Sequence, residues 1–85
     1  MDKHNPHLKA AFIETVENQL ENNDPPEARE TLERLIDQGI SEDEAKVYIA
    51  QAISIEVFDL LQNQGEFSNE RYVKNLKRLP NEPKQ

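Results

Sequence analysis

Two histidines near the start of the chain, His4 and His7, are the residues whose type best suits metal chemistry. A spacing of three places two side chains on one face of a helix. However, Pro6 lies between them, and proline favours the first turn of a helix, so the helix is expected to start between the two. A structural zinc ion takes four nitrogen or sulfur ligands, and the chain has no cysteine. We therefore expect no metal and no other cofactor, and we keep as an alternative a metal site made by His7 with nearby carboxylates, namely Glu14, Glu17 or Glu56.

Glu56 is the carboxylate with the least expected position, because it falls near the edge of the most apolar stretch of the chain. A partly buried carboxylate must find a hydrogen-bond donor or become protonated. The candidate partners are Arg71, Tyr72 and His7. A perturbed acid in a cleft could be catalytic. We interpret Glu56 as a polar tie between helices, with Arg71, Tyr72 and His7 as its candidate partners.

Other catalytic and ligand-binding motifs are incomplete in this sequence. Ser41 and Ser68 stand where helices begin, and Ser54 has no histidine at helical spacing. No glycine-rich phosphate loop is present, and the acidic residues lack the spacing of a calcium loop. The sequence therefore predicts that the protein is not an enzyme, and it identifies no small-molecule ligand.

Charge is unevenly distributed along the chain, whose net charge is −7. Residues 1–70 hold 16 acidic and 5 basic residues, whereas residues 71–85 hold 1 acidic and 5 basic residues. Arg71, Lys74 and Arg78 share one face of the last helix, with Lys77 beside it. Phosphate or nucleic-acid binding by this helix is an alternative, but the acidic remainder would repel a polyanion. Docking of the basic helix on its own acidic body is the favoured interpretation.

The elements that position these residues are defined by three helix starts, at Asp24, Ser41 and Ser68. Each residue type can cap a helix N-terminus through its side-chain oxygen. Gly39 and Gly65 lie just past the ends of the second and third helical patterns, where a left-handed residue often ends a helix. Together these signals predict helices over residues 6–22, 25–38, 42–64 and 69–79, ended by Pro80.

The predicted fold is all-α: a small four-helix bundle in which the third helix is central. Residues 1–79 form a single helical domain, and residues 80–85 form a flexible C-terminal tail. The third helix is expected to bury one broad apolar face, made of Ala45, Tyr48, Ile49, Ala52, Ile53, Val57, Leu60 and Leu61. Its flanks carry Val47, Ile55 and Phe58, which are the candidate interaction surface.

The order of several short motifs resembles a family of short bacterial proteins known as a domain of unknown function. The motifs are Asn5-Pro6-His7-Leu8, Val16-Glu17-Asn18-Gln19-Leu20, Asp24-Pro25-Pro26-Glu27, Thr31-Leu32-Glu33-Arg34-Leu35, Glu44-Ala45, and Arg71-Tyr72 followed by Leu79-Pro80. The family often carries further histidines on the first helix, where this chain has Lys9 and Ile13, so only His7 carries over. The resemblance implies a bacterial, helical protein and supplies no activity.

The function expected from the sequence is that of a non-enzymatic helical module that binds a protein partner or a second copy of itself. No stretch is apolar enough to cross a membrane, and we expect a cytoplasmic location. Nucleic acid is not an expected partner.

Overall fold

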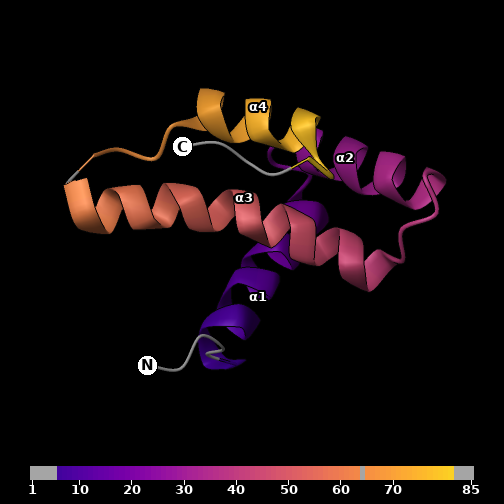
Figure 1. Ribbon diagram of the computed structural model, residues 1–85, viewed down its shortest axis with the longest axis horizontal. Helices are drawn as coiled ribbons and strands as arrows, with labels where there is room; N and C mark the ends of the chain where they lie inside the picture. Colours follow the sequence, from indigo (N-terminus) through magenta and orange to yellow (C-terminus); the bar gives the residue numbers. More distant parts are fainter. Residues whose placement is uncertain (1–5, 64, 82–85) are drawn as a thin grey trace.

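A computed structural model of the chain describes the backbone of residues 6–63 and 65–81 and the side chains of residues 9–62 and 65–81. Four helices make up this part of the chain: α1 (Pro6–Asn22), α2 (Pro26–Asp37), α3 (Glu42–Asn63) and α4 (Asn69–Arg78). α3 packs against each of the other three helices, and α2 also packs against α1 and α4 (Figure 1). The prediction of an all-α four-helix bundle with the third helix at its centre is confirmed.

Two of the three predicted helix starts have the expected geometry. The backbone N–H of Glu44 donates to Ser41 Oγ at 3.2 Å, and the N–H of Arg71 donates to Ser68 Oγ at 3.2 Å. Each bond satisfies an N–H of a first turn, which has no partner within its own helix. Phe67 and Tyr72, on either side of the Ser68 cap, pack edge to face with ring centroids 5.6 Å apart. This hydrophobic staple fixes the direction in which the chain enters α4.

The predicted cap at Asp24 is wrong. The residue that precedes α2 is Pro25, which makes no side-chain cap bond, and Pro26 is the first helical residue. The prolines cause this shift of one residue, because Pro26 restricts Pro25 to the extended conformation that it adopts (φ −77°, ψ 151°). The backbone N–H of Ala28 then donates to the Pro25 carbonyl oxygen at 3.0 Å and starts the helical hydrogen bonds.

The end of α2 follows the predicted glycine signal. Gly39 has a φ of +92°, a value that favours glycine. Its N–H donates to the Ile36 carbonyl oxygen at 2.9 Å, and the N–H of Ile40 donates to the Leu35 carbonyl oxygen at 3.0 Å. These two bonds are the Schellman motif, which satisfies carbonyl groups that the ending helix leaves open. α4 ends at Arg78, because Leu79 precedes a proline and takes an extended conformation.

The core lies where the four helices meet, and all four contribute to it. Its buried hydrophobic residues are Val16 and Leu20 from α1, Ala28, Leu32 and Leu35 from α2, Ala45, Ile49, Ala50, Ala52 and Ile53 from α3, and Tyr72, Leu76 and Leu79 from α4 and its end. Two arginines of α2 bind the ends of neighbouring helices: Arg29 donates to the Leu20 carbonyl oxygen, and Arg34 donates to those of Leu76 and Leu79. These cations lie at helix C-termini, where the helix dipole favours positive charge.

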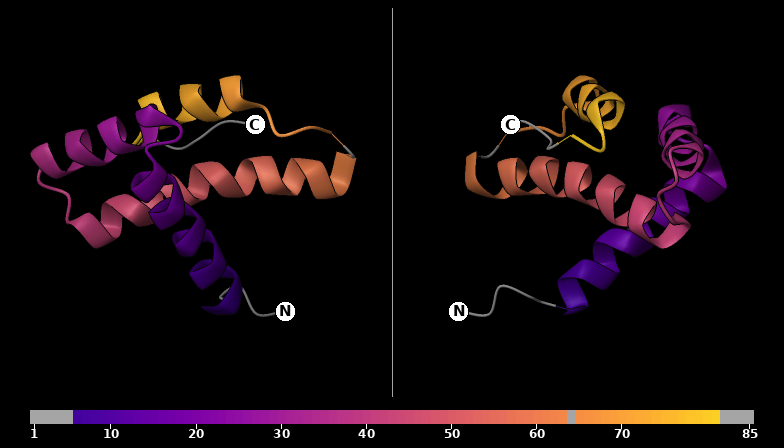
Figure 2. Two further views of the ribbon diagram at one scale, coloured as in Figure 1. Left: turned by 180° about the vertical axis from the view of Figure 1, so that it is seen from behind. Right: turned by 45° about the vertical axis from the view of Figure 1, so that its right-hand side comes forward.

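The prediction that Leu60 and Leu61 belong to the core is wrong. Leu60 is 36% exposed and Leu61 is 74% exposed. The reason is length: at about 1.5 Å per residue, the 22-residue α3 is more than twice as long as the 10-residue α4. α1 crosses α3 and turns away from its last turns, and this divergence is visible from three directions (Figures 1 and 2). The end of α3 therefore keeps an apolar sequence without enough neighbouring helix to cover it.

No helix in the described part of the chain is long and apolar enough to cross a membrane. The predicted flexible tail, residues 80–85, falls mainly on residues 82–85, which lie outside the described residues.

Candidate functional site

Glu56 is completely buried, and three hydrogen bonds reach its carboxylate. Oε1 accepts from the backbone N–H of Ser68 at 2.8 Å and from Arg71 Nη2 at 2.9 Å. Oε2 accepts from Arg71 Nε at 2.5 Å. The guanidinium thus grips both carboxylate oxygens, which is the geometry of a strong bidentate pair. Of the three candidate partners predicted for Glu56, the structure places Arg71 against it.

The ion pair holds the first turn of α4 on α3, because both donors belong to the start of α4. The Glu56 carboxylate also lies beside the positive end of the α4 dipole, which favours its charge. Arg71 Nη2 lies 3.3 Å from Asp59 Oδ2, so one cation serves two carboxylates one turn apart. The hydrogen bonds to Glu56, and secondarily those to Asp59, raise the pKa of Arg71 above its ordinary value.

Gly65 allows the chain to pass close to this cluster. A Cβ atom at position 65 would lie 2.7 Å from Asp59 Oδ2, which is too close without a shift of that carboxylate. Glycine at this position therefore allows the backbone to pass close to the Asp59 side chain. The sequence analysis did not predict this role.

Tyr72 lies in the core but does not bond Glu56. Its hydroxyl donates to Gln19 Oε1 at 2.6 Å, which ties α4 to α1. The residue is 0% exposed, and burial raises the pKa of Tyr72 well above its ordinary value, with the Gln19 hydrogen bond opposing the shift. Among the side chains that the structure describes, no buried polar atom lacks a hydrogen-bond partner. The interior therefore presents no unsatisfied donor or acceptor to a ligand.

The two histidines cannot be placed in a site. His4 lies outside the described residues, and His7 belongs to α1 with a side chain outside them. The carboxylates that the metal hypothesis pairs with His7 have other surroundings: Glu14 is exposed, Glu17 lies 3.4 Å from Lys46 Nζ, and Glu56 is held by Arg71. Within residues 9–62 and 65–81 no three possible metal ligands lie together.

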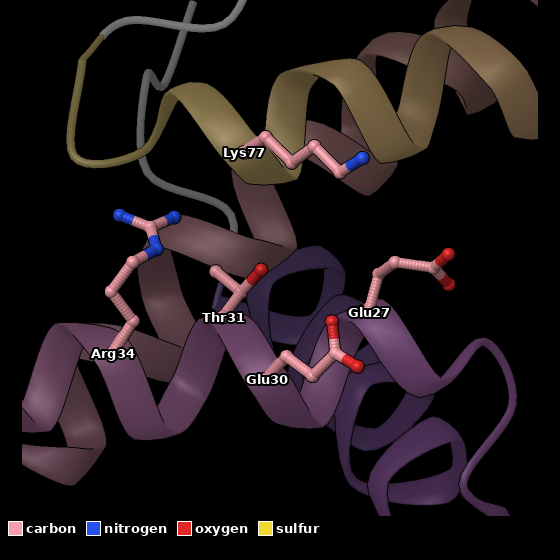
Figure 3. A pocket seen from close by; sticks show the side chains of 5 residues that line it. All are labelled: Glu27, Glu30, Thr31, Arg34 and Lys77. Atoms are coloured by element: carbon pink, nitrogen blue, oxygen red, sulfur yellow. The ribbon is translucent and has the colours of Figure 1, made fainter.

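A shallow pocket of about 220 Å³ lies between α2 and α4 (Figure 3). Its lining combines two acids, two bases and a hydroxyl: Glu27, Glu30, Thr31, Arg34 and Lys77. The Arg34 guanidinium is already engaged by the carbonyl oxygens of Leu76 and Leu79. The lining holds no histidine, so this hollow does not have the residues of a Ser-His-Asp-type hydrolytic site.

The basic residues of α4 have different surroundings. Arg71 turns inward to Glu56, and Lys74 lies 3.3 Å from the exposed Glu70 carboxylate. Two of the four cations proposed for phosphate or nucleic acid are thus engaged by carboxylates of the same chain. This arrangement weakens the electrostatic basis of the nucleic-acid alternative.

The apolar surface is the feature that gathers most clearly in one region. The described residues expose five large hydrophobic side chains, and four of them fall within residues 58–67. We name these four the end cluster: Phe58 (42% exposed), Leu60 (36%), Leu61 (74%) and Phe67 (40%). Of the predicted interaction surface, Phe58 belongs to the end cluster, while Val47 and Ile55 are half-buried on α3.

Sequence reasoning missed Leu60 and Leu61 as exposed residues, because it placed both leucines in the core. The signal that could have found them is the length of the apolar pattern of α3, which continues beyond what a 10-residue α4 can cover. Comparison of the chain with protein-family models, curated proteins and solved structures finds no significant match, so the family resemblance stays an expectation.

Proposed function

We propose that the protein is a non-enzymatic interaction module that binds protein through the end cluster. The observation that carries this proposal is the concentration of four large exposed hydrophobic side chains within ten residues of a chain whose other described residues expose one, Ile36. Scattered apolar side chains are normal on protein surfaces, whereas a concentration of exposed apolar side chains in one region is typical of an interaction site. The resemblance adds a bacterial origin, and a cytoplasmic location is part of the same proposal.

Charge makes this surface different from the rest of the molecule. Residues 47–63 contain two side chains that are charged at neutral pH, Glu56 and Asp59, and both lie within ion-pair distance of Arg71. The carboxylates of α3 next to the end cluster are thus paired, while the exposed Glu66 immediately precedes Phe67. Desolvating the α3 part of this surface costs little, because hydrophobic contact there does not have to offset the loss of hydration around unpaired charged groups.

The two polar features already described support the proposal indirectly. Glu56 is enclosed and saturated with hydrogen bonds, so it serves the structure and has no room to act on a substrate. By holding the start of α4 on α3, the pair with Arg71 also fixes the position of Phe67, which immediately precedes the Ser68 cap. The ion pair therefore organises the apolar surface that we propose as the site.

The test is the native size of the protein in extracts of cells that make it. We expect wild-type protein to elute from a sizing column ahead of its free mass, and Leu61→Lys protein to elute as a free chain. Ile36→Lys is the matched control, because Ile36 is 41% exposed on α2, away from residues 58–67. Elution of the wild type as a free chain, or equal loss in the control, would refute the proposal.

A further inference from the structure

We propose that the pocket between α2 and α4 binds a small zwitterion, namely a free α-amino acid with a short side chain, through its carboxylate and its ammonium group. None of the residues that line this pocket belongs to the end cluster, so the two sites are independent. Three features of the pocket support the assignment: a polar face of α2, a buried hydroxyl without a partner, and unpaired charges that sum to zero.

The face of α2 that lines the pocket is polar. Glu27, Glu30, Thr31 and Arg34 are spaced i, i+3, i+4 and i+7, so they form one stripe along the helix. A stripe with this spacing next to another helix usually carries apolar residues, which pack on that neighbour. Here α4 contributes Lys77, and a hollow of about 220 Å³ remains between the two helices (Figure 3).

Thr31 is the buried member of this lining, with 3% of its surface exposed. Its hydroxyl points toward the pocket rather than into the enclosed interior, and it makes no hydrogen bond to a described residue (Figure 3). The Thr15 hydroxyl, in contrast, donates to the Ala11 carbonyl oxygen one turn earlier in α1. A buried hydroxyl is costly unless it is hydrogen-bonded, so Thr31 favours a ligand with a polar atom at this point.

The charged groups around this hydroxyl are not paired with one another. Glu30 lies four residues before Arg34, a spacing at which two such side chains usually attract each other on a helix. Arg34 instead donates to carbonyl oxygens at the end of α4. Among the described residues, no ion pair involves Glu27, Glu30 or Lys77. Two carboxylates and one ammonium group therefore line the pocket without a partner in that part of the chain.

The balance of charge selects a zwitterion. Two carboxylates and two cations give the lining a net charge of zero. A lone anion would be attracted by the two cations and repelled by the two carboxylates, and a lone cation would meet the reverse. A zwitterion can place its carboxylate at the Lys77 amine and the Thr31 hydroxyl, and its ammonium group at the Glu30 carboxylate. These three groups point into the same space (Figure 3).

The size and openness of the pocket limit the ligand. Pockets for drug-sized molecules measure about 300–1,000 Å³, and this one is smaller. It therefore fits an α-amino acid with a short side chain, such as alanine or serine. Lys77 and Glu30 are exposed to solvent, and exposed ion pairs contribute little free energy. We expect weak binding, with a dissociation constant on the order of 1 mM.

The test is a nuclear magnetic resonance titration of the purified, isotope-labelled full-length chain with alanine, propionate and ethylamine. Propionate and ethylamine each carry one of the two charges of alanine. We expect alanine to shift the backbone amide signals of residues 27–34 and of Lys77 along saturable curves. The other two compounds should bind at least about fivefold more weakly, because each lacks one ion pair and meets like charges.

Three variants separate a ligand site from a merely polar surface. Thr31→Val removes the hydroxyl and keeps nearly the same shape, so it should raise the dissociation constant of alanine about fivefold without lowering thermal stability. Lys77→Gln should raise this constant by about two- to fivefold. Lys74→Gln is the matched control, because Lys74 is an exposed lysine of α4 that pairs with Glu70 outside the pocket. It should leave alanine binding unchanged.

Any of four results would overturn the proposal. They are the absence of saturable shifts at tens of millimolar alanine, shifts confined to residues outside the pocket, propionate or ethylamine binding as tightly as alanine, and unchanged alanine binding in both Thr31→Val and Lys77→Gln. A marked loss of thermal stability in Thr31→Val would also count against it, because the hydroxyl would then have a partner within the protein.

Discussion

Replacing Glu56 by Gln is the sharpest test of how the bundle is held together. The side chains have nearly the same shape, so the substitution changes charge and hydrogen bonding without opening a cavity. A glutamine oxygen can take the place of one carboxylate oxygen. Its amide group must then face an N–H donor of Arg71 or Ser68, and two donors cannot bond each other.

The size of the effect follows from burial. Removing one partner of a fully buried ion pair costs about 3–5 kcal/mol, and a single hydrogen bond to a charged group contributes about 1.5–3 kcal/mol. Glu56 is 0% exposed, but the Arg71 side chain is 29% exposed, so water can solvate the guanidinium in the variant. We therefore expect a loss of about 2–3 kcal/mol, which lowers the melting temperature of a domain this size by roughly 10–20 °C.

The assay is urea and thermal unfolding of Glu56→Gln, followed by circular dichroism, beside a matched control. Glu70→Gln removes a carboxylate from the same helix region, but Glu70 is 82% exposed and pairs only with Lys74 among the described ion pairs. We expect the control to change stability by less than about 0.5 kcal/mol. In a double-mutant cycle, Arg71→Gln combined with Glu56→Gln should cost less than the sum of the two single changes. A Glu56→Gln protein as stable as the wild type would refute the argument that this pair ties α4 to α3.

Three further predictions concern helix ends and the buried tyrosine. Gly39→Ala should lower the free energy of unfolding in urea by about 1–2 kcal/mol, because a residue with a side chain is strained at φ +92°. The space around position 39 is open, so the loss comes from backbone strain alone. An unchanged free energy of unfolding would contradict this argument. Arg34→Ala should cost about 1.5–3 kcal/mol, since it removes the cation that bonds the carbonyl oxygens of the α4 end, and amide exchange there should accelerate. Tyr72 has a folded pKa above its unfolded value of 10.0, so its contribution to stability is complete below pH 10 and is lost as pH rises above it. Relative to Tyr72→Phe, the wild type should therefore lose roughly 1.4 kcal/mol per pH unit above 10 in the free energy of unfolding; a constant difference between the two proteins would contradict this.

The sequence by itself determined the local features of the fold, because they depend on residues close together in the chain. Ser41 and Ser68 accept bonds from N–H groups three residues later, Gly39 adopts a conformation that favours glycine, and Pro80 restricts the residue before it. These signals predicted the four helices to within one or two residues. The exception, Asp24, is also local: two successive prolines moved the start of α2 by one residue.

Tertiary structure decided which groups meet and which surface stays open. The sequence left Glu56 with three candidate partners, and only packing of α4 on α3 selects Arg71 and gives Tyr72 to Gln19. Periodicity alone also placed Leu61 in the core, because a hydrophobic pattern shows which face of a helix is apolar but not how far its neighbours extend. The relative lengths and crossing directions of α1, α3 and α4 expose the end cluster, since a helix can bury only those turns that another element reaches.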